Sequence, residues 1–541
     1  MQEGQSSTAE ALLDLRNERP RDAQPHSPVT GARVSLLKYA PEAVLILVSI
    51  AASIRQPDPD LWGHIRFGQE MVSRRHLVLH DPYSYSAFGH LWRNHEWLAE
   101  VIMALVYDGC GVVGLKLLKF GCTAATVVFV AAGAAETGAS PRLQLLVVGT
   151  AATAIAPNMQ FRPQLFTFLL FAAMLVLLAR NTYRGSAPLW ILVPIMAFWT
   201  NLHGGFFIGI ITLTVYASIT IFQSLGTQQL SGQARQLVLL AVAVTLATLL
   251  TPYGSGAWLA VIHALRNPVT HTIIEDWQPW PAFVWNGGQV RYGYIFFGLS
   301  AFGLIGALAA SVRFTLRAGD LPLTTVAAIM SVGGFVANRN MPLAAIACVA
   351  PVARHLTLWQ STKGTRLGVE RAALFSGTGR WLMFMVAIAL PVYTGRLFSN
   401  RLRIDTPYPA GAVAFMKQRG LHGNLLSQYD WGEYLIWHMA PSSKVFMDGR
   451  YDTVYPDGVF QDYLAFHLNL ADAARVLRTH PHDFVLVSPD AKAYVLMEKS
   501  VGWKLIYHDQ DCALFAPTNS PATKLPGAPF AGKSPGIQYF P

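Results

Sequence analysis

Hydrophobic positions in this chain gather into blocks separated by short polar stretches. Many blocks approach the ~20 residues that a helix needs to cross the ~30 Å hydrocarbon core of a bilayer. The pattern predicts eleven membrane-spanning helices, at residues 39–54, 117–135, 143–157, 163–179, 187–200, 204–224, 236–251, 292–311, 322–338, 341–357 and 381–396. A further apolar stretch, 97–113, contains Glu100 and Asp108 and ends in a glycine-rich run.

Charge distribution decides how stretch 97–113 lies. If it crossed the membrane, the basic clusters at 180–184, 313–317 and 363–380 would lie outside, against the positive-inside rule. As an amphipathic helix in the membrane interface, it leaves all three clusters in the cytoplasm. We therefore expect a multi-pass protein of the inner (cytoplasmic) membrane with a cytoplasmic N-terminus, an extracytoplasmic loop at 55–116 and an extracytoplasmic C-terminus.

The two ends of the chain differ in composition and hydrophobic pattern from the predicted membrane domain, 39–396. Residues 1–38 are polar and lack an apolar core, which predicts a cytoplasmic tail and no cleavable signal peptide. Residues 402–520 alternate short β-type runs with helical stretches, which predicts a small extracytoplasmic α/β domain. Residues 521–541 are rich in Pro and Gly and are expected to be disordered. The predicted fold class is a mainly α polytopic membrane protein with a small C-terminal α/β domain.

Composition supports the membrane interpretation and narrows the function classes. Hydrophobic residues make up 52% of the 541 positions and charged residues 13%, against roughly a quarter charged in soluble domains. The net charge of +10 comes mostly from basic residues between apolar blocks, so it reflects topology and no nucleic-acid partner is expected. Four cysteines, three of them in or beside apolar segments, exclude a disulfide framework or a cysteine zinc site.

The first predicted external loop concentrates acids, imidazoles and aromatics. Asp58, Asp60 and His64 follow the first span, His80 and Asp81 lie mid-loop, and His95 and Glu96 close it. A carboxylate held at the end of a span can accept a proton from a hydroxyl or hold a divalent cation. The alternative is that Asp58 and Asp60 are solvated or cap a helix, and that Asp81, before proline, belongs to a turn.

Three further residues on the same predicted face suit an anionic ligand. Arg162 and Arg339 interrupt apolar stretches at short outer turns, where the positive-inside rule disfavours them. Guanidinium groups match phosphate oxygens, although a single arginine there can equally anchor the protein to headgroups. His203 precedes Gly204 and Gly205, which permit either close approach to a ligand or close helix packing.

Later polar clusters are weaker candidates. Glu275 and Asp276 lie in the second long external loop, 252–290, where a pair of acids is commonly just solvated. In the tail, Asp430 and Trp431 lie in the run Tyr429-Asp430-Trp431-Gly432-Glu433-Tyr434. The run Met447–Asp452 is either a second substrate-facing cluster at a strand end or, as its pattern favours, a strand followed by a glycine turn with Asp448 and Arg450 on the surface.

The order of span, acid, loop and interfacial helix resembles the GT-C class of membrane glycosyltransferases, in the branch of the protein O-mannosyltransferases and aminoarabinose transferases. Asp60-Leu61-Trp62-Gly63-His64 stands at the acidic motif and Asn94-His95-Glu96-Trp97-Leu98 at the second motif. The family's Asp-Glu pair is not intact, and His-Glu replaces its Pro-Pro. The resemblance covers roughly residues 40–360, and the run at Tyr429–Tyr434 is similar to the Trp-Trp-Asp-Tyr-Gly motif of oligosaccharyltransferases.

This resemblance implies transfer of a sugar from a polyprenyl-phosphate donor to a hydroxyl of a glycan, lipid or protein at the extracytoplasmic face, among membrane lipids. Asp60 would be the general base, and Arg162 and Arg339, with His203, would stabilise the leaving phosphate. His64, His95 and Glu96 would orient a substrate or bind a divalent metal ion as a cofactor. The alternatives are a lipid or small-solute transporter or flippase, which usually places charges within spans, and a membrane anchor for a sensing domain.

Overall fold

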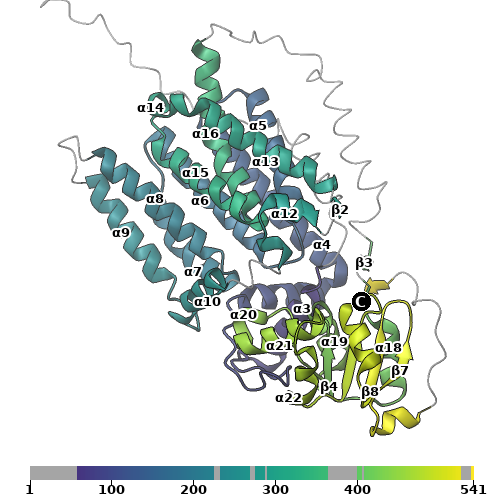
Figure 1. Ribbon diagram of the computed structural model, residues 1–541. Coiled ribbons are helices and arrows are strands. Elements are labelled where there is room, and N and C mark those ends of the chain that lie inside the picture. The colour runs from purple at the N-terminus through teal and green to yellow at the C-terminus, as the bar shows by residue number, and fades with distance from the viewer. Residues whose placement is uncertain are drawn as a thin grey trace, which may run out of the picture.

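The structure, a computed structural model, describes residues 58–224, 232–267, 274–286, 289–290, 292–362, 399–404, 407–525 and 538–541. The predicted spans 39–54 and 381–396 and the predicted tail 1–38 lie outside these residues. A helical part and a mixed α/β part follow one another and meet at helix α3 (Leu61–Arg74) and the loop after it (Figure 1).

Every predicted span within the described residues coincides with a helix. The described helices of this part are α4 (Trp97–Glu136), α5 (Pro141–Ile155), α6 (Gln164–Arg184), α7 (Leu192–Leu202), α8 (Phe206–Ser224), α9 (Gly232–Ala247), α10 (Gly256–Arg266), α12 (Trp280–Val284), α13 (Tyr292–Ser311), α14 (Thr315–Ala318), α15 (Leu321–Val336) and α16 (Met341–Thr362), of which α10, α12 and α14 lie outside the predicted spans. Five described helical segments are long and apolar enough to cross a membrane: Trp97–Glu136, Gln164–Arg184, Phe206–Ser224, Phe297–Ala318 and Asn338–Thr362. Shorter apolar helices lie at Leu189–Leu202, Ala234–Ala247 and Leu321–Val336. The protein is therefore mainly helical, with the apolar helices of a membrane protein.

The apolar helices pack around one core. Helix α4 packs on α6, α16 packs on α5, α13 and α15, and α8 packs on α9 and α15. This core contains large side chains such as Phe168, Phe171 and Trp199 together with small ones such as Ala151 and Ala345. Small residues let helix backbones approach closely, which suits membrane helices that gain little from the hydrophobic effect.

Helix α4 is broken at Gly111, which joins the expected interfacial stretch 97–113 to the expected span 117–135. Gly111 has φ 58° and ψ −151°, a conformation that suits glycine. A helix of 40 residues would be about 60 Å long if straight, twice the hydrocarbon thickness. The first half of α4 packs against α3, where Asp108 accepts a hydrogen bond from Gln69 at 2.6 Å.

The C-terminal part contains a five-stranded sheet of order β5-β4-β6-β8-β7. Strand β4 (Asn424–Ser427) pairs in parallel with β5 (Lys444–Val445) and β6 (Phe484–Val487), while β8 (Ala513–Pro517) is antiparallel to β6 and to β7 (Trp503–His508). The accompanying helices are α18 (Ala410–Gln418), α19 (Gly432–Met439), α20 (Tyr451–Val454), α21 (Asp457–His467), α22 (Val476–Thr479) and α23 (Lys492–Lys499).

The described residues of the predicted tail 521–541 are 521–525 and 538–541. Pro521–Lys524 forms a 3-10 turn, and β9 (Gln538–Phe540) pairs antiparallel with β3 (Leu402–Ile404). Phe540 is buried, with its ring centroid 4.4 Å from that of Trp62 in α3. The apolar side chain of Phe540 thus contacts a residue far away in sequence, and the disorder expected for the tail as a whole stays a prediction.

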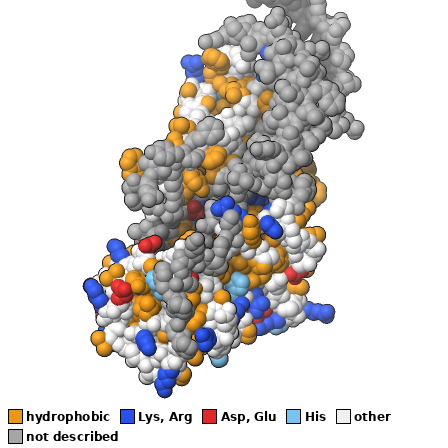
Figure 2. All heavy atoms as spheres, turned by 90° about the vertical axis from the view of Figure 1, so that its right-hand side faces the viewer, with side chains coloured by type: hydrophobic (Ala, Val, Ile, Leu, Met, Phe, Trp, Pro, Cys, Tyr) orange, Lys and Arg blue, Asp and Glu red, His pale blue; other side chains and the backbone are white. Residues whose placement is uncertain are grey.

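The C-terminal part and the first loop share one hydrophobic core. This core contains Leu61, Trp62 and Phe67 of α3 together with buried residues of every strand of the five-stranded sheet. Tyr83 and Tyr85 exchange backbone hydrogen bonds with Val445 at 3.1 Å, so the loop extends the edge of the sheet. Figure 2 shows most of the visible charged side chains over the lower, C-terminal half, and mainly apolar or uncharged atoms over the described helices above.

Candidate functional site

Three carboxylates surround the guanidinium of Arg162. Asp58 and Asp60 come from the turn that starts α3, and Asp276 comes from the 3-10 turn η4 (Glu275–Trp277). Arg162 Nε lies 2.6 Å from Asp58 Oδ1, Nη2 lies 2.7 Å from Asp60 Oδ2, and Nη1 lies 3.1 Å from Asp276 Oδ2. The Asp60 backbone N–H also donates to Asp58 Oδ1 at 3.0 Å. The structure thus brings together four of the residues expected from sequence, 218 positions apart at the extremes.

Burial and neighbouring charges shift the pKa values of Asp58 and Arg162 in this cluster. Burial raises the pKa of Asp58 to about 6 although Arg162 lowers it, and the neighbouring Asp60 adds to the rise. Burial lowers the pKa of Arg162, but the carboxylates of Asp58, Asp60 and Asp276 outweigh burial and raise it well above its usual value. One guanidinium therefore contacts three carboxyl groups, which outnumber it within the cluster.

His203 is held by hydrogen bonds that fix its tautomer. The backbone N–H of Gly205 donates to His203 Nδ1 at 2.9 Å, and Thr167 Oγ1 lies 2.9 Å from the same nitrogen. Because Nδ1 accepts, the proton of the neutral ring is on Nε2, which lies 3.5 Å from Glu96 Oε1. Burial lowers the pKa of His203 to about 3, so the ring is neutral. His95 Nε2 lies 3.8 Å from the same oxygen of Glu96.

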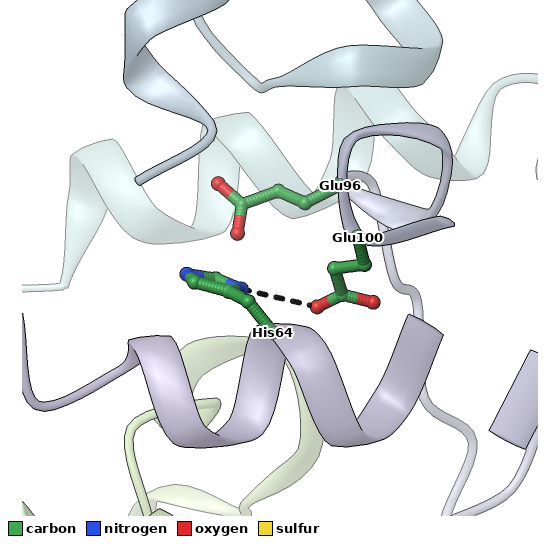
Figure 3. A group of neighbouring side chains, drawn as sticks. All are labelled: His64, Glu96 and Glu100. Carbon is green, nitrogen blue, oxygen red and sulfur yellow. Dashed lines mark hydrogen bonds and ion pairs between the residues drawn. The ribbon is translucent and has the colours of Figure 1, made fainter. Parts of the chain in front are cut away.

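His64, Glu96 and Glu100 offer one ligand atom each within 4.8 Å of one another, the spacing of a metal site. Figure 3 shows the imidazole between the two carboxyl groups, with a hydrogen bond of 3.3 Å from Nδ1 to Glu100. Burial lowers the pKa of His64, but the hydrogen bond to Glu100 and the charges of Glu96, Glu100 and Asp60 raise it to about 9. A protonated imidazole has no lone pair for a metal. A metal ion would bind here only with loss of that proton, and the divalent metal ion remains an expectation from sequence.

Arg339 is placed differently from Arg162. Its guanidinium lies over the ring of Trp277, 4.6 Å from the centroid. Among the described residues, no carboxylate lies within 4.0 Å of it. An aromatic face attracts a cation without neutralising it, so Arg339 keeps its charge available for a ligand.

One cavity of about 340 Å³ joins these groups. Its polar lining includes Asp60, His64, His95, Glu96, Glu100, Arg162, His203 and Arg339. Its apolar lining comes from Phe207 and Ile208 of α8, Leu265 of α10 and Leu343 of α16. The C-terminal part closes the cavity with Tyr429, Asp430, Glu433, Gly449, Arg450, Tyr451 and Thr453.

Some residues expected in the site lie elsewhere. Asp81 is 1% exposed and pairs with Arg450 at 2.8 Å, and it does not line the cavity. Trp431 is buried and donates from Nε1 to the carbonyl of Pro407 at 2.9 Å, while its neighbour Asp430 lines the cavity. Glu275 begins η4, directly before Asp276.

The expectation that Asp448 and Arg450 lie on the surface is wrong. Asp448 is 0% exposed, and Arg450 contacts it through Nε at 2.8 Å and Nη2 at 2.7 Å. Glu433 and Gly449 also belong to the cavity and were not among the expected site residues. The run Tyr429–Tyr434 carried a signal for Glu433, whereas nothing local distinguished Gly449 from an ordinary turn glycine.

Comparison with known proteins relates this arrangement to known folds. No protein-family model and no curated protein sequence matches the chain. The oligosaccharyltransferase AglB of Archaeoglobus fulgidus, in complex with an inhibitory peptide and a dolichol-phosphate, aligns with a TM-score of 0.55 at 14% identity over 84% of this chain and 70% of that one. Its apo form aligns with a TM-score of 0.52 at 12% identity, over the same shares. This chain has their fold.

A mycobacterial structure gives the same fold in another enzyme. The arabinofuranosyltransferase AftD, in a mutant form, aligns with a TM-score of 0.50 at 14% identity, over 90% of this chain and 42% of that one. The likeness to these glycosyltransferases is one of fold, and it agrees with the fold that the sequence resemblance implies. The narrower resemblance to protein O-mannosyltransferases and aminoarabinose transferases stays a prediction.

Proposed function

We propose that this protein is a membrane glycosyltransferase that transfers a sugar from a polyprenyl-phosphate donor to an acceptor hydroxyl at the extracytoplasmic face. The observation that carries the proposal is one cavity lined by the carboxylate of Asp60, the guanidinium of Arg339, which has no carboxylate partner among the described residues, and the apolar side chains of α8, α10 and α16. A base, an anion site and an apolar wall are the parts that this reaction requires. The GT-C fold supports the same reaction class.

Asp60 is the general base in this proposal. Arg162 holds its Oδ2 at 2.7 Å, and the side chain is 27% exposed, so the carboxylate is fixed but reachable. A carboxylate in this position can take the proton of an acceptor hydroxyl while the hydroxyl oxygen attacks the anomeric carbon. Arg162, with three carboxylate partners, orients Asp60 rather than binding the leaving phosphate.

Arg339 is then the cation for the leaving phosphate. Charge on the phosphate oxygens grows as the sugar departs, and preorganised donors stabilise that charge most effectively. The Nε2–H of His203 lines the same cavity and can add a neutral donor. The polyprenyl chain would follow Phe207, Ile208 and Leu343, because its methylene and methyl groups gain by contact with apolar surface.

The test is transfer from a labelled polyprenyl-phosphate sugar in membranes containing Asp60→Asn. Asparagine keeps an oxygen that can accept from Arg162 but is not a base, so we expect transfer to fall about 10²- to 10⁴-fold at unchanged expression. Asp472→Asn, at a 61% exposed side chain that contacts only Arg478 among the ion pairs of the described residues, is the matched control. Undiminished transfer by Asp60→Asn would eliminate Asp60 as the base. Labelled lipid crossing a vesicle bilayer with no new glycosidic bond would instead favour a transporter.

A further inference from the structure

Glu433 is a buried carboxyl group that no step of the proposed reaction uses. It lies near the start of α19, is 3% exposed and lines the same cavity as Asp60. Its Oε2 accepts a hydrogen bond of 3.0 Å from the backbone N–H of Gly63, 370 positions earlier in the chain. The C-terminal part therefore places an acid against the first turns of α3, beside the proposed base.

The two carboxyl oxygens of Glu433 have different neighbours. Oε2 accepts from Gly63, so it is the carbonyl oxygen if the group is protonated. A carbon added to Gly449 would lie 2.9 Å from Oε1 of Glu433 and 2.6 Å from Oδ1 of Asp60, so these two oxygens flank the glycine. Asp60 uses its other oxygen, Oδ2, for Arg162. Oε1 of Glu433 and Oδ1 of Asp60 are thus the oxygens left for a ligand between them.

The charges that face Glu433 oppose its ionisation. They are Asp60 at the start of α3, Glu100 of α4, and Asp448 and Arg450 before α20. Arg450, the one cation of this set, is committed to Asp81 and Asp448. Within the described chain, no basic nitrogen lies within 4.0 Å of the Glu433 carboxyl. Burial and the charges of Asp60 and Asp448 raise the pKa of Glu433 well above its usual value.

We propose that Glu433 is a neutral carboxylic acid whose Oε1–H binds a hydroxyl group of the carbohydrate substrate beside Asp60. The proposal rests on the proposed glycosyl transfer, because it names the ligand of the same cavity. A carboxylic acid next to a carboxylate presents one donor and one acceptor, which matches a polyhydroxylated ligand whose hydroxyls both donate and accept. The C-terminal part would then be a substrate-binding wall of the site.

Two substitutions separate a neutral donor from an ionised acid. Glu433→Gln keeps the carbonyl oxygen for Gly63 and replaces O–H by N–H, while Glu433→Met keeps the length and removes both polar atoms. We expect transfer at neutral pH to be about 5- to 100-fold higher in Glu433→Gln than in Glu433→Met, the range expected for leaving a buried polar partner unsatisfied. Equal loss in both variants, at normal expression, would show that an ionised carboxylate is required and would overturn the proposal.

The pH profile gives a second readout. At high pH wild-type Glu433 ionises next to Asp60. It then has no O–H to donate, and its negative charge repels that of Asp60. We expect wild-type transfer to fall on the alkaline side, and Glu433→Gln, which cannot ionise, to lack this fall. Glu498→Gln, at an exposed glutamate of α23, is the matched control and should follow the wild-type profile. An alkaline fall that persists unchanged in Glu433→Gln would contradict the assignment.

Infrared spectroscopy distinguishes failure of this inference from failure of the proposed function. The C=O stretch of a protonated carboxylic acid should appear at neutral pH in the difference spectrum of the purified wild type minus Glu433→Gln, and it should be missing from the difference spectrum of the wild type minus Glu498→Gln. Absence of this difference band for Glu433→Gln would overturn the inference whatever the transfer assay gives. A wild-type protein that has the band but transfers no sugar would refute the proposed function and, with it, the substrate role of Glu433.

Discussion

Replacing Arg450 by methionine should loosen the C-terminal part from the first loop. Arg450 reaches Asp81 of the loop through Nη1 at 2.8 Å and Asp448 through Nη2 at 2.7 Å. Its guanidinium lies about equally far from three rings, 5.1 Å from that of Phe67, 5.0 Å from Tyr83 and 4.8 Å from Trp92. The cation therefore joins α3, the loop after it and the segment between β5 and α20.

The magnitude follows from burial. The side chains of Arg450, Asp81 and Asp448 are 4%, 0% and 0% exposed, so the variant leaves two carboxylates buried without their cation. Removing one partner of a buried ion pair costs about 3–5 kcal/mol. Methionine still packs against the rings, so most of this cost comes from the lost charge. At about 1.4 kcal/mol per tenfold change, opening of the C-terminal part should become about 10²- to 10⁴-fold more frequent.

Cys512 reports this opening. Its side chain is 0% exposed in the core that the C-terminal part shares with the first loop. A thiol reagent reacts with a buried cysteine only when its surroundings open, so the labelling rate in the native state follows the opening equilibrium. We expect Cys512, identified by peptide mass spectrometry, to react faster in Arg450→Met by up to the factor above, while the exposed Cys110 reacts at its usual rate.

Arg478→Met is the control, because Arg478 pairs with Asp472 at 3.6 Å and both side chains are more than half exposed. Exposed pairs contribute at most about 1 kcal/mol, so labelling in this variant should stay near the wild-type rate. Adding Asp81→Asn to Arg450→Met should restore part of the protection, since it removes one unpaired buried charge. Labelling of Cys512 in Arg450→Met at the rate of Arg478→Met would refute the reasoning.

Two further predictions concern the cavity. Arg339→Gln should lower sugar transfer about 10²- to 10³-fold with little change in thermal stability. Arg162→Gln should lower the melting temperature as well, because three carboxylates lose their cation. A clear loss of stability in Arg339→Gln would contradict this contrast. His64 has a folded-state pKa of about 9, above its ordinary 6.5, so its contribution to stability is fully present below pH 6.5 and is lost as pH rises through 9. Melting curves of the wild type and His64→Gln should therefore differ at pH 6.5 and converge above pH 9, and a constant difference would show that Glu100 and Glu96 do not hold the imidazolium.

The helical part and the acid–arginine cluster could be predicted because they follow from patterns along the chain. Apolar blocks set the helices, and the positive-inside rule assigned the polar turns to one face, which placed Asp60, Arg162 and Asp276 on the same side. The structure brings these three side chains into contact. The sequence alone could not show that Arg162 would pair with Asp58, Asp60 and Asp276 together, because the partner of a charged side chain depends on helix packing and not on the local sequence pattern.

The C-terminal wall of the site could not be predicted for a physical reason. Glu433 and Arg450 owe their burial to α3 and the first loop, whose contact partners Gly63 and Asp81 lie about 370 positions earlier. Charged residues beside a glycine turn are exposed in most proteins, and Arg450 is the exception because it finds a carboxylate that only the folded chain supplies. The resemblance of Tyr429–Tyr434 to an acceptor motif pointed to this wall. It named Asp430 and Trp431 equally as site residues, although Trp431 belongs to the core.

Arg162 and Arg339, both in the lining of the cavity, show what decides whether a cation is available to a substrate. Both lie in short turns beside apolar helices, and the 3-10 turn η4 contacts both through adjacent residues: Asp276 binds Arg162, and Trp277 lies under Arg339. A carboxylate fixes a guanidinium and cancels its charge, whereas an indole face fixes it and leaves the charge in place. Through these two residues, η4 makes Arg162 a support for Asp60 and leaves Arg339 able to bind a phosphate. The division of roles in the proposed reaction follows from which of these two neighbours each arginine meets.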